Sequence, residues 1–317
     1  MGISEEFSFI VTIRSTGERT EKACIRSLLK EGIRESQINL IREAPFKKSL
    51  ETCFQTAYKA QTKWLLTVDA DMIIIPGTLR GFFQMAEEMP EQNLQIQGNN
   101  LDKFFASVRS GGPRIYRVDY LRTAYEISKN LPDNIRPESN VISELGEKEH
   151  PSRYISTVNC IHDFGQYYSD IYRKSYAHSI KHIKKLPKIL QNTADKRAID
   201  PDYKVFIKGI FDSLLSDIDV SIDKRILKDE TAQALQQLHI SEKKDIPESI
   251  DVQKIIKEYS LLDQWISYEN CRIKDVPRTP TRLISENLKK KGNIKGIMYL
   301  FGLTLSRAGE YLQRVGK

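Results

Sequence analysis

Residues 64–79 read WLLTVDADMIIIPGTL, an apolar run that ends in two carboxylates. The first part, Trp64 to Val68, has the composition of a buried strand. Asp69 and Asp71 follow at positions i and i+2, so on an extended chain their side chains point to the same side. Pro76-Gly77 then breaks the chain before a second amphipathic run begins. The stretch therefore predicts a strand whose carboxyl end carries two acids.

Two acids in that place favour a ligand site. Ligands of open α/β sheets bind at the carboxyl ends of the strands. Two carboxylates supply hard oxygen ligands, which suit Mg²⁺ or Mn²⁺ with a phosphate on the open side of the cation. An Asp-x-Asp pair is also common in solvated turns at a sheet edge, so the motif alone leaves both interpretations open.

The segments before this stretch alternate between strand and helix patterns. Strands are expected at residues 7–13 and 37–42. Helices are expected at 20–31, ended by Gly32, and at 47–60. Alternation of this kind builds right-handed βαβ units and a parallel sheet. The predicted class is α/β.

In this order the chain resembles the GT-A fold glycosyltransferases, nucleotide-sugar-dependent enzymes with a Rossmann-like, mostly parallel central sheet. The resemblance covers residues 7–180. It rests on a polar turn with Arg14 after the first strand, an acid, Glu43, after the second, and a basic-led helix before the strand that ends in Asp69 and Asp71. It implies a nucleotide diphosphate sugar as the donor substrate and a divalent cation, Mn²⁺ or Mg²⁺, on the pyrophosphate.

The resemblance also implies where the ligands lie. Asp69 and Asp71 would hold the cation, joined by His162 at the end of an expected strand over residues 157–161, because imidazole is an acceptable Mn²⁺ ligand. The residues expected to surround the donor nucleotide are Thr12, Arg14, Glu18, Glu43, Asp69, Arg109, Gly111 and Gly112.

A catalytic carboxylate is expected near a helix that starts at about Ser139. Glu138 is the first candidate and Glu144 the second, as the base that deprotonates the acceptor hydroxyl. An acid in the first turn of a helix also interacts favourably with the helix dipole, so a purely structural role for Glu138 stays open.

A Gly-Gly-Pro sequence separates two extended segments downstream of the acids. Ser110-Gly111-Gly112-Pro113 is expected to form a turn between residues 103–108 and 115–118. Such a turn either lines the donor cleft together with Arg109 or simply connects a hairpin.

Beyond Tyr168 the chain becomes helical in pattern, with helices expected at 168–190, 201–217, 228–238 and 252–268. The predicted organisation is a catalytic domain over residues 1–178 and an α-helical C-terminal region over 179–317. His178 and His182 have the i, i+4 spacing of a zinc pair, but their lysine neighbours favour a solvated basic helix face.

The last part of the chain joins a lysine cluster to an apolar patch within residues 289–305. This combination suits peripheral contact with an anionic membrane surface. Packing of the same apolar stripe on the helical region is the alternative.

Composition places the chain among ordinary globular proteins. Of its 317 residues, 40% are hydrophobic and 29% charged, and 49 basic residues against 42 acidic ones favour an anionic partner. The absence of a long apolar run, of a signal-peptide start and of paired cysteine spacing predicts a cytoplasmic protein with reduced thiols, peripheral to the membrane at most.

The predicted function is sugar transfer from a nucleotide sugar to a glycan, lipid-linked or protein acceptor. Two alternatives remain. A sugar-phosphate nucleotidyltransferase would share the sheet and the cation, although the single glycine of residues 14–19 disfavours it. A non-catalytic basic adaptor for membrane or nucleic acid is the other, and no specific nucleic-acid motif supports it.

Overall fold

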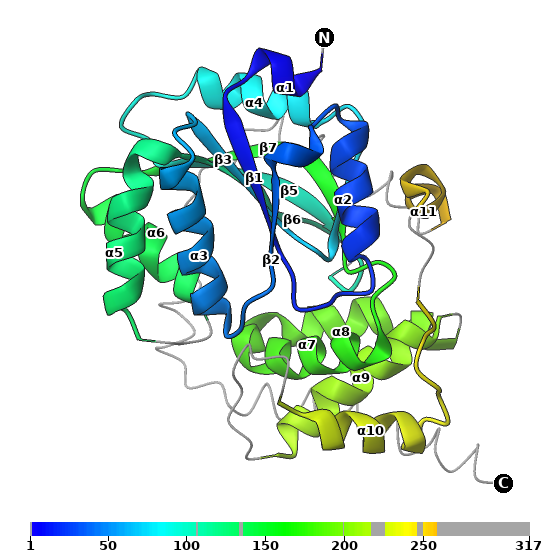
Figure 1. Ribbon diagram of the computed structural model, residues 1–317. Coiled ribbons are helices and arrows are strands. Elements are labelled where there is room, and N and C mark those ends of the chain that lie inside the picture. The colour runs from blue at the N-terminus through cyan, green and yellow to red at the C-terminus, as the bar shows by residue number, and fades with distance from the viewer. Residues whose placement is uncertain are drawn as a thin grey trace, which may run out of the picture. The chain divides into compact units, whose positions relative to one another are not determined.

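The computed structural model describes residues 2–105, 107–132, 136–198, 200–216, 226–245 and 250–258 (Figure 1). All of these belong to one compact unit that extends to Ser267. The remaining residues, including the 289–305 segment and Cys271, lie outside the described part. Cys24, Cys53 and Cys160 are free and buried, as expected.

One sheet of seven strands forms the centre of the fold. The strands are β1 (Phe9–Arg14), β2 (Ile38–Ile41), β3 (Trp64–Asp69), β4 (Met72–Ile74), β5 (Gln95–Asp102), β6 (Ser107–Arg117) and β7 (Ser152–His162). Their order in the sheet is β2-β1-β3-β6-β5-β7-β4. Strands β4 and β6 run against the other five, so the sheet is mixed but mostly parallel. The predicted Rossmann-like α/β class is confirmed.

Helices connect and cover these strands. They are α1 (Ile3–Glu6), α2 (Glu21–Lys30), α3 (Phe46–Lys59), α4 (Leu79–Glu87), α5 (Leu121–Asn130), α6 (Pro137–Glu147), α7 (Tyr168–Lys181), α8 (Leu186–Ala194), α9 (Pro201–Leu214), α10 (Lys228–Gln237) and α11 (Val252–Glu258). Within the described ranges, no helix is both long and apolar enough to span a bilayer.

Alternation of side chains along the strands produces two cores. In β3, Trp64, Leu66 and Val68 pack with α2 and α4 on one face of the sheet. Leu65 points the other way and packs with α3, α5 and α6. Figure 1 shows α2 and the α3, α5 and α6 group on opposite sides of the sheet. This two-sided burial explains why β3 reads as a continuous apolar run.

The register of the strands brings polar residues to one edge. Arg14 and Asp69 are paired at the carboxyl ends of β1 and β3. Asp102 and His162 are paired at the carboxyl ends of β5 and β7. The helices α7 to α10 lie beyond this edge in Figure 1. The sheet therefore places the predicted acids, and the predicted histidine, on the side that faces the helical region.

The predicted Gly-Gly-Pro turn is wrong. Residues 110–113 lie inside β6, which runs without a break from Ser107 to Arg117. A Cβ atom added at Gly112 would stand 2.6 Å from the carbonyl oxygen of Asn99 on β5. Glycine is needed there because β6 approaches β5 closely where their register shifts, with residues 111–113 of β6 opposite a single residue of β5, not because the chain reverses.

The helical region differs from expectation in its boundaries. The predicted helix 168–190 is divided into α7 and α8 by a short 3₁₀ turn, and the expected domain boundary after residue 178 falls within α7. Asp200 caps α9 by accepting a hydrogen bond from the backbone N–H of Asp202. The predicted helix 252–268 begins at Val252 and is described as far as Glu258.

Candidate functional site

A cavity of about 980 Å³ opens at the polar edge of the sheet. The strand ends form its floor, the loop after β1 and the start of α6 form two sides, and α7 forms a wall that crosses the carboxyl ends of the strands. A second hollow of about 630 Å³ adjoins it and shares Thr16, Glu43, Ala44 and Arg173. Both hollows lie at the carboxyl ends of strands, which is where α/β sheets bind their ligands.

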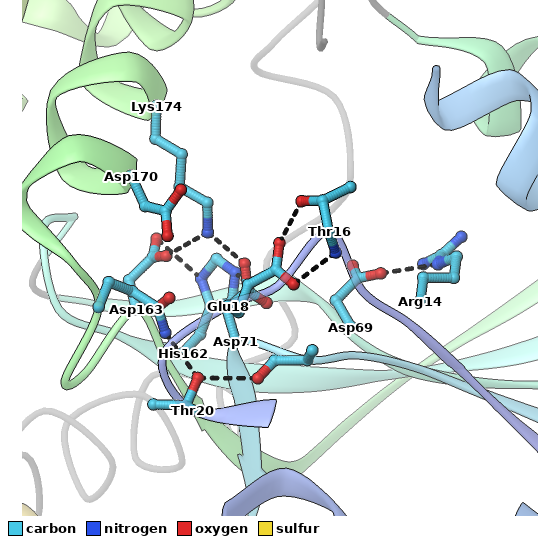
Figure 2. Close-up of polar contacts among 12 residues, drawn as sticks. Arg14, Thr16, Glu18, Thr20, Asp69, Asp71, His162, Asp163, Asp170 and Lys174 are labelled. Carbon is cyan, nitrogen blue, oxygen red and sulfur yellow. Dashed lines mark hydrogen bonds and ion pairs between the residues drawn. The ribbon is translucent and has the colours of Figure 1, made fainter. Parts of the chain in front are cut away.

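Arg14 organises the floor of this cavity. Its Nε donates to Asp69 Oδ1 over 2.6 Å, and its Nη1 donates to Glu138 Oε1 over 2.9 Å. The side chain of Arg14 is buried, whereas that of Asp69 is 30% exposed. Asp69 is thus held in place from behind, and its carboxylate is available to a ligand in the cavity (Figure 2).

Glu138 is enclosed by basic and hydroxyl partners. Besides Arg14, it accepts a hydrogen bond from the Tyr116 hydroxyl over 2.8 Å and lies 3.2 Å from Arg114 Nη1. Burial alone would raise the pKa of Glu138, but the two guanidinium groups lower it to about 2. The carboxylate is therefore permanently ionised and committed to its neighbours at neutral pH.

Three potential cation ligands converge at the end of β7. One donor atom from each of Asp71, His162 and Asp163 can be chosen so that all lie within 4.8 Å of one another. Asp71 Oδ1 is buried without a hydrogen-bond partner in the described part of the chain, and His162 Nε2 lies 3.5 Å from it. These donors are carboxylate oxygens and an imidazole nitrogen, a set suited to Mn²⁺ or Mg²⁺.

The orientation of His162 is fixed by Asp102. His162 Nδ1 lies 3.0 Å from Asp102 Oδ2. Asp102 is held in turn by Arg109 Nη1 at 2.6 Å and by the backbone N–H groups of Phe104 and Phe105. A carboxylate behind a histidine selects the tautomer that presents the other nitrogen to a metal. Here Nε2 is the nitrogen that faces Asp71.

A lysine occupies the space between two of these ligands. Lys174 extends from α7, and its ammonium pairs with both Asp71 and Asp163, with 2.5 Å to Asp163 Oδ1 (Figure 2). Burial opposes the charge of Lys174, but Asp163 and Asp71 raise its pKa above the ordinary value. Burial likewise opposes the charge of His162, and Asp163 and Asp71 raise its pKa to about 10.

The basic face of α7 is a wall of the cavity rather than a solvated surface, so that prediction is wrong. Lys174, His178 and Lys181 lie at i, i+4 and i+7 and all line the cavity, together with His182. Phe105 packs edge-on against both histidine rings, with ring centroids 5.4 Å and 5.5 Å away. The pKa of His182 is lowered to about 3 by burial and by the charges of Arg109 and Lys181.

Most of the predicted site residues line this cavity: Arg14, Glu18, Glu43, Asp69, Asp71, Arg109, Gly111, Glu138 and His162. Thr12 does not, because it is fully buried within β1. Gly112 packs against β5, and Glu144 lies 3.5 Å from Lys148 on α6, away from the cavity lining. The positions of these three residues do not support the roles predicted for them.

Sequence reasoning missed several residues that complete the site. Asp163 follows His162 directly and was visible as a second polar residue at a strand end. Arg114 and Tyr116 sit on alternate positions of β6 and face Glu138. Lys174 had no local signal, because its proximity to Asp71 depends on how α7 crosses the sheet.

No family model matches the chain, and no curated protein sequence matches it. Solved structures are similar to it at low identity. A glycosyltransferase involved in the glycosylation of the major capsid of PBCV-1 is 14% identical, with a TM-score of 0.36 over 50% of this chain and 95% of that chain. A mannosyltransferase from Pyrobaculum calidifontis, in complex with GDP-Man and Mn²⁺, is 9% identical, with a TM-score of 0.39 over 83% of this chain and 82% of that chain.

A third similar structure is 4-diphosphocytidyl-2C-methyl-D-erythritol synthase from Anaerococcus prevotii. It is 9% identical, with a TM-score of 0.36 over 49% of this chain and 88% of that chain. At this level of similarity, the functional argument rests on the residues of the site themselves.

Proposed function

We propose that this chain transfers a sugar from a nucleotide diphosphate sugar to an acceptor hydroxyl with the help of a divalent cation. The observation that carries the proposal is the convergence of Asp71, His162 and Asp163 at the carboxyl edge of the sheet. This cluster opens onto a cleft whose other walls carry basic side chains, which suits a diphosphate. The resemblance of the sequence to GT-A glycosyltransferases supports the same reading.

The cluster fits a cation on physical grounds. Asp71 Oδ1 is buried without a hydrogen-bond partner among the residues that the structure describes, and His162 Nε2 lies 3.5 Å from it, so a cation bound by both would satisfy an oxygen that is costly to leave without a partner. His162 is oriented from behind by Asp102. When Mn²⁺ or Mg²⁺ is bound there, it neutralises charge that develops on the leaving diphosphate.

The remaining residues divide the cleft between donor and acceptor. The hollow next to Thr16, Glu43 and Arg173 is the proposed place of the nucleoside, because it adjoins the main cavity and is lined by residues that follow β1 and β2. Asp69, held by Arg14, would accept hydrogen bonds from a donor hydroxyl. The acceptor would then enter from the other end of the cavity, along α6 and α7.

In the proposed reaction, the acceptor oxygen forms a bond to the anomeric carbon. The bond from that carbon to the diphosphate oxygen breaks, the diphosphate leaves with the electron pair, and the departing diphosphate accepts the proton of the acceptor hydroxyl. A base with a pKa of about 2 is poorly matched to removing the hydroxyl proton at neutral pH. We therefore assign Glu138 as a positioning residue for Arg14 and Arg114, in place of the base role predicted from sequence.

Nucleotidyl transfer is the second candidate, because it uses the same kind of sheet and cation. The loop after β1 disfavours it. Glu18 accepts hydrogen bonds from the backbone N–H and the hydroxyl of Thr16. The carboxylate of Glu18 therefore already uses the backbone N–H that a triphosphate would need as a donor. A carboxylate in this position also repels phosphate groups.

The test is a thermal-shift screen of UDP-, GDP-, CMP- and dTDP-sugars with and without Mn²⁺, followed by Asp71→Asn. A bound ligand raises the apparent stability of the folded chain. We expect one nucleotide to stabilise the wild type only with Mn²⁺, and Asp71→Asn to lose that stabilisation while remaining folded. Glu144→Gln is the matched control, since it removes an acid outside the cavity. Metal-independent binding, or unchanged binding by Asp71→Asn, would contradict the proposal.

A further inference from the structure

Five basic side chains line the part of the cavity near the start of α6 and the end of α7, and one of them, Arg109, also contacts Asp102 behind His162. We call this group the basic wall: Arg109 of β6, Arg136 at the start of α6, and His178, Lys181 and His182 of α7 and its C-cap. Burial, and then the charges of Arg136 and Arg109, lower the pKa of Lys181. Burial, and then Arg109 and Lys181, lower the pKa of His182 and keep it neutral. Residues from three elements therefore form one electrostatic unit.

The charge of Lys181 is not compensated by a nearby carboxylate among the described residues. Arg109 is paired with Asp102 at 2.6 Å. The carboxylates that influence Lys181 are Glu138 and Asp69, and both are already bound by arginine. No carboxylate lies within ion-pairing distance of the Lys181 ammonium in the part of the chain that the structure describes. His178 Nδ1 is buried there without a hydrogen-bond partner.

Lys181 is too far from the cation cluster to bind the same phosphate group as the cation. Lys174, which contacts Asp71 and Asp163, and Lys181 are seven residues apart on one face of α7. At 1.5 Å per residue this separates their backbone positions by about 10 Å. A donor diphosphate at the cation would leave the sugar between itself and the wall. The anion at the wall must then belong to the second substrate.

We propose that the acceptor carries a phosphate group and that Lys181, Arg136 and the two histidines bind it. This inference rests on the proposed function, and it names the class of acceptor that the site accepts. The start of α6 adds the positive end of a helix dipole to the same place, since Arg136, Pro137, Glu138 and Ser139 all line the cavity. A phosphate accepts hydrogen bonds from several such donors at once, which a neutral hydroxyl cannot do.

Two sources of such a phosphate differ in what else they would contact. Ile180 and Ile183 are close to Lys181 in the sequence and are 49% and 58% exposed, although neither lines the cavity. A phosphorylated lipid would place its phosphate on the wall and its chain against these residues, whereas a soluble phosphorylated polyol would use the wall alone. The experiment therefore has one arm for each source.

The full chain is first loaded with Mn²⁺ and the nucleoside diphosphate that the screen identifies. Binding of glycerol 3-phosphate, with glycerol as the uncharged comparison, is then measured by calorimetry. A second arm measures co-sedimentation with phosphatidylcholine vesicles that contain phosphatidic acid. We expect Lys181→Met to weaken phosphate binding roughly tenfold, because a charged hydrogen bond is lost. Lys181→Arg should retain it, and Lys129→Met, which removes an exposed charge on α5, should change nothing.

Nucleoside diphosphate binding by Lys181→Met is measured in parallel. The inference holds if that binding is unchanged while phosphate binding falls in either arm, and the arm that responds identifies the source. It is overturned if Lys181→Met binds glycerol 3-phosphate and the vesicles as the wild type does, or if the variant loses the nucleotide instead. If the wild type binds no nucleotide with Mn²⁺, the proposed function fails. If nucleotide binds and neither phosphate source does, only this inference fails.

Discussion

The ammonium of Lys174 lies 2.5 Å from Asp163 Oδ1 and also pairs with Asp71, so a cation of the chain itself stands between two of the three proposed metal ligands. Both carboxylates are buried, Asp163 almost completely. Two ionised acids in such a place require a positive partner. Lys174 supplies it in the absence of metal, and a divalent cation must compete with Lys174 for the same oxygen atoms.

This competition predicts that Lys174→Met binds Mn²⁺ more tightly than the wild type does. The internal competitor is removed and the ligands remain, so we expect an increase of roughly tenfold or more in affinity. Electron paramagnetic resonance of free Mn²⁺ measures it directly. The metal-free variant should also melt at a lower temperature, because Asp71 and Asp163 lose one of their two positive partners in the described part of the chain and keep only His162, and added Mn²⁺ should reverse the loss. Equal or weaker affinity would show that Lys174 does not occupy the metal position.

Glu138→Gln separates a base from a positioning residue. Replacement of a catalytic base lowers turnover and leaves the affinity for the donor unchanged. We expect donor affinity to fall about tenfold along with turnover, because Arg14 and Arg114 lose the charge that holds them. Measurement of donor binding by calorimetry, next to kcat, distinguishes the two outcomes. Unchanged donor affinity with a large loss of kcat would restore Glu138 as the base.

The stability of the chain at low pH tests independently whether Glu138 is ionised in the folded state. The pKa of Glu138 is about 2 in the folded chain, below its ordinary value of 4.5. Its ionised form therefore stabilises the fold at neutral pH, and this contribution is lost as the pH falls from about 4.5 to about 2. Urea unfolding across this range should show a shallower acid dependence for Glu138→Gln than for the wild type. Parallel curves would mean that Glu138 is not held as an ion.

The sequence predicted those parts of the site that depend on local strand patterns. The β3 strand with Asp69 and Asp71 is a continuous apolar run followed by acids, and His162 ends another strand, so periodicity alone places both at the sheet edge. Lys174 is 103 positions from Asp71, and no pattern in α7 states which strand end it will cross.

The two errors in the same region have a common physical cause. Gly112 and the basic face of α7 were interpreted from local chemistry, as a turn and as a solvated surface. Both are decided by what packs against them, β5 in the first instance and the cavity in the second. Close approach between elements and burial of charge are tertiary properties, and local pattern rules do not contain them.

Phosphate binding at the basic wall should weaken as the pH rises through about 8. Burial, with Arg136 and Arg109, lowers the pKa of Lys181 to about 8, while Glu138 and Asp69 oppose that shift. His178 and His182 are neutral throughout this range, because their pKa values are lowered. Lys181 therefore loses its charge between pH 7 and 9.

Calorimetric titration with glycerol 3-phosphate, which remains a dianion over this range, should show the loss of phosphate binding for the wild type. Lys181→Arg should show a flat profile, because a guanidinium stays charged. A flat profile for the wild type would place the charge elsewhere.

Gly209→Ala should destabilise the chain, although alanine is the better helix former by about 1 kcal/mol. Gly209 lies on α9, and a Cβ atom there would stand 2.1 Å from Ser175 Oγ and 2.5 Å from the Tyr172 carbonyl oxygen, both on α7. Backbone cannot yield as a flexible side chain does, so the helices must separate, at a cost of about 1–3 kcal/mol.

Gly146→Ala on α6 is the matched control, since its Cβ would meet nothing within 4 Å and the change should be neutral or stabilising. Because α7 carries both Lys174 and Lys181, the Gly209→Ala variant should also weaken two properties together: the competition of Lys174 with Mn²⁺, and the binding of phosphate at Lys181. Chemical denaturation of both variants decides the matter, and a stabilising Gly209→Ala would mean that α9 does not pack on α7 this closely.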